Sequence, residues 1–290
     1  MTPTERTEAI PLETAHSRKG RKPVAVVTPV YRLPLTSEEE ISLKHLRRYL
    51  GRIDKYIVAP KSLSVSWPDF RTRHFKDAFF ADVSGYSKLL LARQFYQAFA
   101  QYEYILIYQL DCLVFSSDLE FWCAKQWDYA GAPWFENYEN NSTGGFWAVG
   151  NGGLSLRKVS SALAVLESKM LYEDPVERGK RTRYFPASPV LRSMACRAKT
   201  FLHRHGYRNK INWYLKELTN EPNFHEDRFW AFDAKRFMPS FHIPSPLKAV
   251  AFSFECAPRY CLTANADRLP FGCHAWAKWD RDFWEPHLLK

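Results

Sequence analysis

Polar residues that follow apolar runs are the parts of this sequence best suited to chemistry. The first is Asp111 in the segment Tyr108-Gln109-Leu110-Asp111, which ends the apolar run ILIY (105–108). In an open α/β sheet, ligands bind beyond the carboxyl ends of the strands, where this aspartate would lie. A carboxylate there can hold a divalent cation, and the cation can hold a diphosphate. An aspartate that only caps a strand or turn gives the same pattern, so this motif alone does not decide.

A glycine loop supplies the second candidate. Gly150-Asn151-Gly152-Gly153 lies between two apolar strand pieces in the segment FWAVGNGGLSLR (146–157). Glycine allows positive φ angles and a close approach of the backbone to a ligand. A tight turn or bulge between the strand pieces is the alternative interpretation.

An acidic helix start and a histidine near the C-terminus complete the set. His225-Glu226-Asp227 opens an amphipathic segment, where a carboxylate could be the general base that accepts a proton from an acceptor hydroxyl. The helix dipole also favours acidic residues in a first turn, without any catalytic role. His274, in PFGCHAW (270–276), could be a metal ligand or a buried core residue.

The elements around these residues predict an α/β fold. Residues 24–31 (VAVVTPVY) form a continuous apolar run, typical of a strand buried on both faces. Thr36 and Glu39 form a capping-box pattern, leucines follow at helical spacing, and Gly51 ends the predicted helix. Residues 55–59 (KYIVA) give a second strand, and a right-handed crossover makes the two strands parallel.

The alternation of helices and strands continues along the chain. A helix is expected over 86–100, opened by Ser84-Gly85, and it is followed by a strand over 102–115 and a helix near 118–125. A strand and turn over 128–134 and two strand pieces over 146–157 come next. The rest of the chain is expected to form helices over about 158–170, 190–204, 211–218 and 226–236, and then loops with short strands over 243–290. Together they predict a central mixed, mostly parallel sheet flanked by helices.

The predicted organisation is a single domain over 23–290, preceded by a disordered tail over 1–22. A basic, partly helical insertion is expected over about 172–225. Between positions 176 and 210 there are ten Lys or Arg residues and one acidic residue, Glu177. The net charge of the chain is +10, which favours acidic partners such as nucleic acid, anionic lipid or phosphorylated substrates. A solvated helical face is the alternative for the insertion.

Composition narrows the class of protein further. Of the 290 residues, 46% are hydrophobic and 25% are charged, as in a globular protein. Aromatic residues make up 16%, which suits either a sugar site or an aromatic-rich core. No apolar run reaches the roughly 20 residues of a membrane span, and the N-terminal segment has no apolar signal core. Six cysteines without a CxxC pair argue against a zinc module and for reduced thiols, although disulfides stay possible. The expected location is cytoplasmic, with possible peripheral contact on the inner face of a membrane.

The order of these motifs resembles that of GT-A glycosyltransferases, and more narrowly that of the DUF5672 family. The segments that carry the resemblance are YSKLLL (86–91), YQLDCLVF (108–115), DYAGAPW (128–134), GNGGLSLR (150–157), HEDRFW (225–230) and PFGCHAW (270–276). They occur in the family's order and cover roughly 24–280, with the basic insertion only loosely included. The resemblance implies a GT-A fold and transfer of a sugar from a nucleoside-diphosphate sugar to a hydroxyl acceptor.

The resemblance also implies a metal site. GT-A enzymes carry a D-x-D motif whose last carboxylate binds Mn²⁺ or Mg²⁺, and Asp111 takes that place. Gln109 stands where the first aspartate would be, which lowers the expected metal affinity because one carboxylate holds a hard cation less well than two. His274 matches a C-terminal histidine that supplies another metal ligand.

The other site residues follow by the same resemblance. The implied donor and nucleotide residues are Thr28, Pro29, Val30, Tyr31, Arg32, Lys88, Gln109, Leu110 and Asp111. Asn151, Gly152 and Gly153 would form the floor near the donor sugar and acceptor, and Trp134 is either an acceptor platform or a core residue. Asp227 is implied as the general base of an inverting enzyme and Glu226 as an acceptor-positioning residue. UDP is taken as the nucleotide from its frequency among GT-A enzymes, and the acceptor would be a glycan, a lipopolysaccharide or a lipid-linked molecule.

Two alternatives from other classes remain at this point. The basic segment 176–210, with its neighbouring aromatic residues, could bind nucleic acid without any carboxylate site. A sugar-binding homologue that has lost catalysis is the other alternative, with Gln109 as the lesion. Nucleic acid is the less expected partner.

Overall fold

Six strands form the central sheet of the computed structural model, which describes residues 20–136, 145–174 and 189–289. Their spatial order is β3-β2-β1-β4-β9-β6. The strands are β1 (Lys22–Pro29), β2 (Asp54–Pro60), β3 (Arg71–Phe75), β4 (Tyr102–Tyr108), β6 (Tyr129–Ala130) and β9 (Leu154–Lys158). The first four are mutually parallel, whereas β9 is antiparallel to β4 and β6. The expected mixed, mostly parallel sheet is confirmed.

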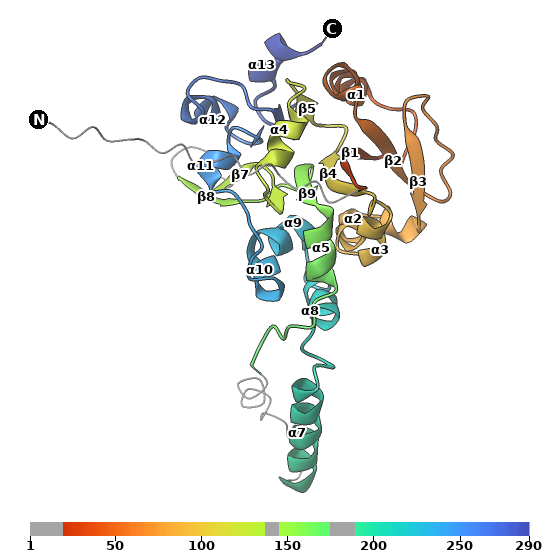
Figure 1. Ribbon diagram of the computed structural model, residues 1–290, viewed down its shortest axis with the longest axis vertical. Helices are drawn as coiled ribbons and strands as arrows, with labels where there is room; N and C mark the ends of the chain where they lie inside the picture. Colours follow the sequence, from red (N-terminus) through yellow and green to blue (C-terminus); the bar gives the residue numbers. More distant parts are fainter. Residues whose placement is uncertain (1–19, 137–144, 175–188, 290) are drawn as a thin grey trace, which may run out of the picture.

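Alternate side chains of β1 enter two different cores. Val24 and Val26 pack in the cluster on one face, and Ala25 and Val27 pack in the cluster on the other. Helices cover both faces (Figure 1): α1 (Ser37–Leu50) and α4 (Leu119–Ala124) lie on the first, and α2 (Val83–Leu90), α3 (Arg93–Gln97) and α5 (Val159–Leu166) lie on the second. Burial on both faces explains why the sequence of this strand is continuously apolar.

Helix α1 begins where the sequence predicts. The Thr36 hydroxyl accepts a hydrogen bond from the Glu39 N–H at 3.2 Å, and the Glu39 carboxylate accepts one from the Thr36 N–H at 2.7 Å. Both halves of the capping box are therefore present. Leu43, Leu46 and Leu50 are buried against the sheet, as their spacing predicts.

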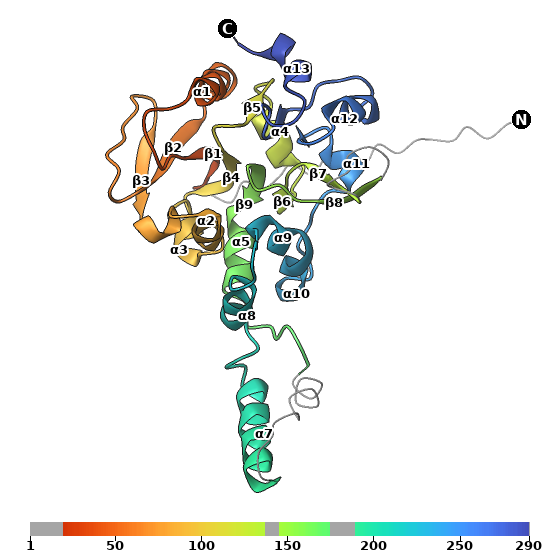
Figure 2. The same cartoon turned by 180° about the vertical axis from the view of Figure 1, so that it is seen from behind.

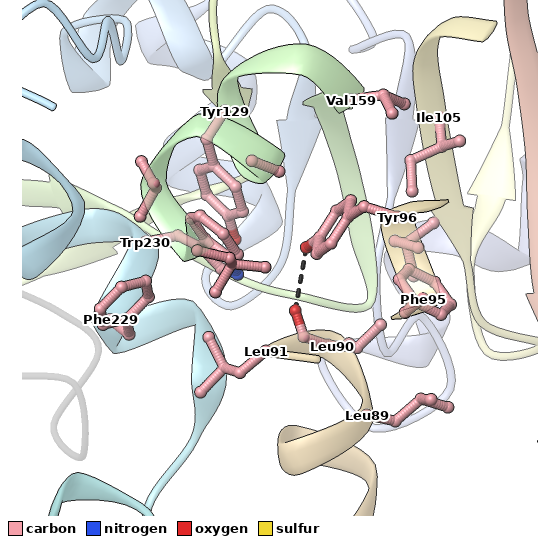
Figure 3. Packing of buried hydrophobic residues seen from close by; sticks show 14 of the residues in the cluster. Leu89, Leu90, Leu91, Phe95, Tyr96, Ile105, Tyr129, Val159, Phe229 and Trp230 are labelled. Atoms are coloured by element: carbon pink, nitrogen blue, oxygen red, sulfur yellow. Dashed lines mark hydrogen bonds between the residues drawn. The ribbon is translucent and has the colours of Figure 1, made fainter. Parts of the chain in front are cut away.

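The single helix expected over 86–100 is instead two short helices. The Asp82 side chain caps α2 by accepting a hydrogen bond from the Gly85 N–H at 2.7 Å, so the helix starts earlier than predicted. At its other end, the Tyr96 hydroxyl of α3 donates to the Leu90 carbonyl at 2.9 Å, within the aromatic core that Figure 3 shows. This bond satisfies a carbonyl that would otherwise be left open at the end of α2, and it stabilises the break.

The segment expected as one strand over 102–115 is also divided, because the chain turns at Gln109–Cys112. Beyond the turn, β5 (Leu113–Val114) joins a second small sheet in the order β10-β11-β5, with β10 (Ser253–Phe254) and β11 (Gly272–Cys273). A third sheet is the hairpin of β7 (Pro133–Phe135) and β8 (Phe146–Val149).

Three further elements differ from those predicted. Strand β3, with the sequence RTRHF, is a polar edge strand and has no apolar alternation to predict it. The end of the chain contains short helices as well as strands: α11 (Pro246–Ala249), α12 (Pro258–Ala264) and α13 (Arg281–Trp284). The helix expected over 226–236 contains a π-helical turn, Phe229–Asp233, between α9 (Glu226–Arg228) and α10 (Ala234–Phe237).

Helix α7 (Pro189–Arg204) projects away from the sheet beyond α8 (Ile211–Leu218), as both views show (Figures 1 and 2). Part of the expected basic insertion, the Lys and Arg residues between 178 and 183, lies outside the described residues. The same holds for nearly all of the expected tail over 1–22. In the described part of the chain, no helix combines the length and the apolar character that crossing a membrane requires. The five cysteines whose side chains are described are buried and unpaired.

Candidate active site

The pairing of β5 with β11 brings Asp111 and His274 together. Leu113 is opposite Cys273 in this antiparallel pair, and the Trp276 N–H donates to the Asp111 carbonyl at 3.2 Å. The turn that ends β4 and the residues that follow β11 therefore lie side by side. His274 Nε2 lies 3.4 Å from the Asp111 carboxylate and 3.3 Å from Gln109 Oε1.

Glu255 orients the imidazole ring from its other side. Strand β10 runs parallel to β11, so Glu255 follows its strand at the same edge at which His274 follows β11. The Glu255 carboxylate lies 3.2 Å from His274 Nδ1. Such a carboxylate favours the tautomer that carries its proton on Nδ1 and leaves Nε2 free to bind a metal.

The charges of this group favour a cation. Burial alone lowers the pKa of His274, but the Asp111 and Glu255 carboxylates outweigh burial and raise the pKa to about 10. Burial raises the pKa of Asp111, but the charge and hydrogen bond of His274 oppose that rise, and the resulting pKa lies below the ordinary value. The two carboxylates therefore hold the imidazole between them in its positively charged form, and a metal ion would bind Nε2 only by displacing the proton there.

The donor atoms suit a hard divalent cation. The Asp111 carboxylate and the Gln109 amide oxygen both lie next to His274 Nε2, and the two oxygen donors suit Mg²⁺ or Mn²⁺. Cys112 lies beside Asp111 and His274. Burial raises the pKa of its thiol well above the usual range, and the thiol donates to the Gly153 carbonyl at 3.3 Å. Cys112 is therefore a neutral neighbour and not a thiolate ligand.

Three glycines of the loop between β8 and β9 each lie against a different site residue. A Cβ atom at Gly150 would lie 1.9 Å from the Trp134 ring, one at Gly152 would lie 2.4 Å from Glu226 Oε1, and one at Gly153 would lie 2.1 Å from His274 Nε2. Real Cβ atoms do not approach so closely, so these positions require glycine for steric reasons. Asn151 between them has a φ angle of +69°.

The glycine loop also holds Asp227. The Asn151 and Gly152 N–H groups donate to Asp227 Oδ2 at 3.1 and 3.3 Å. Burial raises the pKa of Asp227, while the nearby His225 and the backbone N–H groups oppose that rise, and the resulting pKa lies above the ordinary value. A carboxylate with a raised pKa accepts a proton more readily and is better suited to act as a general base.

Glu226 is engaged in a buried ion pair. Arg157 Nη2 donates to Glu226 Oε1 at 2.7 Å and Nη1 donates to Oε2 at 3.2 Å, with both side chains almost fully buried. Arg157 also donates to the Tyr96 hydroxyl and to Ser155 Oγ. Burial raises the pKa of Glu226, and the charge of Arg157 opposes that rise. Both oxygens of Glu226 are thus bound by Arg157, and its expected role in positioning an acceptor stays a prediction.

A cavity of about 920 Å³ joins these groups at the carboxyl ends of β1 and β4. One wall is aromatic: the Trp134 and Trp147 rings are stacked with centroids 6.3 Å apart, and Phe232 lies 5.9 and 5.0 Å from them. Trp147 is 58% exposed and Phe232 is 40% exposed, so these rings present free faces at the cavity. The Asn151 side chain is buried beside this wall, and its Nδ2 has no hydrogen-bond partner among the described residues.

Twelve of the residues singled out by sequence line this cavity. They are Pro29, Tyr31, Gln109, Leu110, Asp111, Trp134, Asn151, Gly152, Gly153, Glu226, Asp227 and His274. Thr28 and Val30 are buried in β1 and the turn after it, Lys88 is exposed on α2, and Arg32 pairs with Glu39 at 3.0 Å. None of these four is among the residues that line the cavity. Among the described residues, the Lys and Arg side chains that line the cavity are those of Lys278 and Arg228.

Sequence reasoning missed several residues of the site. Glu255 had a usable signal, because it follows the apolar run AFSF (251–254) as Asp111 follows its own strand. Arg157 had none, since a basic residue at the end of a strand ordinarily faces solvent. Trp147 and Phe232 gave no signal in a sequence with so many aromatic residues.

Residues 69–274 match the family described as "Protein of unknown function (DUF5672)". This match covers more than half of the chain, and the protein therefore belongs to the DUF5672 family. No curated protein matches the chain in sequence.

Several solved structures are similar in fold. One is a glycosyltransferase involved in the glycosylation of the major capsid of PBCV-1, with 9% identity, a TM-score of 0.43, and coverage of 92% of this chain and 98% of that one. GlyE, a glycosyltransferase of Streptococcus pneumoniae TIGR4, has 11% identity, a TM-score of 0.39, and coverage of 92% and 60%. An active-site mutant of LgtC has 12% identity, a TM-score of 0.47, and coverage of 92% and 96%. The cavity itself is the basis for the function proposed below.

The contact between Gly153 and His274 gives a prediction about metal binding. In a Gly153→Ala variant the new methyl group displaces the His274 ring, because the ring and the methyl group would occupy the same space. We expect Mn²⁺ affinity, measured by calorimetric titration, to fall about 10- to 100-fold, the range found when the support of a ligand is lost. Gly145→Ala is the matched control, because a Cβ atom there meets nothing within 4 Å. Equal Mn²⁺ affinity in the Gly153→Ala variant and the unaltered protein would contradict the site.

Proposed function

We propose that this chain is a GT-A glycosyltransferase whose single domain, residues 23–290, transfers a sugar from a nucleoside-diphosphate sugar to a hydroxyl acceptor. One observation carries the proposal: a single cavity holds a cation-binding group at Asp111 and His274, and a carboxylate suited to proton transfer at Asp227. A diphosphate leaving group requires the first, and an attacking hydroxyl requires the second. The cavity lies at the carboxyl edge of the parallel strands, where ligands of α/β sheets bind.

The donor side lies between the end of β1 and Asp111. Pro29 and Tyr31 line the cavity there, and the Tyr31 ring is 57% exposed, so it offers a face for a nucleotide base. Lys278 lines the same cavity and would balance the charge of a diphosphate, whereas Lys88 and Arg32, which were expected as donor residues, do not line it. A Mn²⁺ or Mg²⁺ ion held by Asp111 and His274 would supply further positive charge to the diphosphate. We propose UDP as the nucleotide of the donor.

Asp227 would remove the proton from the acceptor. Its Oδ2 is fixed by the Asn151 and Gly152 N–H groups, so the carboxylate is already oriented before substrate binds. As the acceptor oxygen attacks the anomeric carbon, its bond to hydrogen breaks and the proton passes to Asp227. The transition state has oxocarbenium character, and the bond to the diphosphate oxygen breaks on the opposite side. This direct displacement inverts the anomeric configuration.

The aromatic wall supports a carbohydrate acceptor. Pyranose rings expose C–H faces that pack on aromatic rings, and Trp147 and Phe232 present free faces in the cavity that also contains Asp227. In this arrangement Glu226 does not touch the acceptor. Its ion pair with Arg157 fixes the start of α9 and thereby the position of Asp227.

Donor binding is the direct test of the proposal. We expect one nucleoside diphosphate to raise the Tm in a thermal-shift screen, and to do so more strongly with Mn²⁺, because a ligand that binds only the folded state stabilises it by about 2.7 kcal/mol at roughly 100 times its Kd. Asp111→Asn keeps the side-chain volume but removes the charge, and should abolish the Mn²⁺-dependent part of the shift. If no nucleotide changes the Tm at any Mn²⁺ concentration, the proposal is wrong.

The raised pKa of Asp227 predicts the pH dependence of transfer. Only the ionised carboxylate accepts a proton, so kcat/KM should rise with pH through a limb that lies above the ordinary aspartate pKa and level off at higher pH. Asp227→Asn should reduce kcat by about 10²- to 10⁴-fold, with unchanged donor binding in the thermal-shift assay. A rate near that of the unaltered protein contradicts the role of Asp227. A product with the anomeric configuration of the donor contradicts inversion, and any transfer with Mn²⁺ excludes the inactive homologue.

The aromatic wall predicts a change in acceptor affinity. Trp147→Ala removes an exposed stacking face without opening the core, so we expect KM for a saccharide acceptor to rise about tenfold while KM for the donor stays unchanged. The measurement is initial-rate kinetics with each substrate varied in turn. Tyr260→Ala is the control, because Tyr260 is an exposed aromatic residue that packs nearby on Phe135 and Phe146 but does not line the cavity. Equal acceptor KM values in the two variants would contradict an acceptor site on this wall.

A further inference from the structure

Helix α7 carries an apolar stripe that faces solvent. Met194, Ala198 and Phe201 recur at spacings of four and three residues, which places them on one side of the helix, and the ring of His205, directly after the helix, lies 4.2 Å from that of Phe201. All four are exposed, with Met194 at 64% and Phe201 at 58%. A helix at a protein surface ordinarily turns such a stripe toward the core. Here the helix projects away from the rest of the molecule (Figures 1 and 2). The side chains of the stripe are exposed.

The charge around the stripe has one sign. Residues 193–216, which we call the basic arm, contain six Lys or Arg residues and no Asp or Glu. Arg197 and Arg204 are exposed and lie seven residues apart, on one side of the helix, and Arg208 is exposed in the turn after it. The arm thus combines exposed apolar side chains with positive charge, and Glu217, the residue directly after it, accepts a hydrogen bond from Trp213 Nε1 at 2.8 Å.

A sharp turn after α7 adds a hollow to this surface. Gly206 has a φ angle of +73°, and the Tyr207 N–H donates to the Leu202 carbonyl at 2.9 Å, which closes the end of the helix. The hollow, of about 740 Å³, lies between the end of α7 and the start of α8. Its lining includes Phe201, His205, Tyr207, Lys210, Trp213 and Lys216. Tyr207 is 71% exposed, and Lys216 Nζ lies 5.2 Å from the centre of the Trp213 ring.

The base of the arm is attached to the domain by polar contacts. The Glu173 N–H donates to the Asn209 side-chain oxygen at 3.1 Å, and the Asn209 amide donates back to the Glu173 carbonyl. The Tyr172 N–H donates to the Asn209 carbonyl at 3.2 Å, and Tyr172 packs against Tyr214 of α8. The hollow therefore has a fixed geometry relative to the domain.

We propose that the basic arm docks the protein on an anionic phospholipid surface. Met194 and Phe201 would enter the boundary between headgroups and acyl chains, Tyr207 and Trp213 would lie at headgroup level, and the Lys and Arg side chains would reach the lipid phosphates. The apolar stripe favours this partner over nucleic acid, because an aliphatic side chain such as Met194 gains little from a phosphate backbone. The inference is independent of the proposed sugar transfer, since it uses no residue of that cavity.

Vesicle binding by the full chain tests the proposal. We expect sedimentation with vesicles that contain phosphatidylcholine and phosphatidylglycerol, no sedimentation with phosphatidylcholine alone, and release as salt is raised. Lys210→Gln with Lys216→Gln should lower partitioning by about tenfold or more, since each basic residue near the surface contributes to binding. Met194→Ser with Phe201→Ser should lower partitioning while leaving the positive charge intact. That second pair separates insertion into lipid from simple attraction of charges.

A matched control and three outcomes decide the result. Phe121 on α4 is an exposed phenylalanine with Lys125 above its ring at 4.1 Å, so Phe121→Ser removes a similar surface group outside the arm and should leave partitioning unchanged. Circular dichroism and the Tm show that each variant is folded. Equal binding to neutral and anionic vesicles, unchanged binding in the Met194 and Phe201 variant, or tighter binding to an oligonucleotide than to anionic vesicles would each overturn the proposal.

Discussion

The arrangement of the candidate site depends on one buried ion pair, Arg157 with Glu226. Two opposite charges removed from water are tolerated only because their geometry is bidentate and further partners, Tyr96 and Ser155, bind the guanidinium. Arg157 belongs to a central strand and Glu226 to the first turn of α9. Loss of either partner would leave an uncompensated charge in the core, so the pair fixes the position of α9 relative to the sheet. Asp227, the next residue, is thereby directed at the glycine loop.

The site is assembled from segments that are far apart in the chain. The turn after β4 supplies Gln109 and Asp111, the small sheet supplies Glu255 and His274, and α9 supplies Asp227. The glycine loop lies between these segments, and its backbone contacts Cys112, His274 and Asp227. The Asp111–His274 side and the Asp227 side of the cavity are therefore coupled through a single short stretch of backbone.

Several elements of the fold and one site residue could be predicted from sequence, because the residues that determine them are close together in the chain. The capping box at Thr36, the apolar strand β1 and the carboxylate at the end of β4 are each encoded within a few residues, and all are found at the expected places. Other features are encoded by partners distant in sequence. Lys88 was expected to face the nucleotide, but the Asp82 cap fixes the start of α2 and Lys88 lies in solvent. Glu226 could not be recognised as an ion-pair partner, because Arg157 lies on a different element.

The glycine loop also limits how this protein can diversify. A substitution at Gly150, Gly152 or Gly153 would disturb several walls of the cavity through one backbone shift, so these positions are poor places to alter specificity one substrate at a time. Tyr31 and Trp147 line the cavity from different elements and are largely exposed, so neither supports much of the core. A directed-evolution library should therefore vary those two positions and leave the loop unchanged, so that the two ends of the cavity change independently of each other.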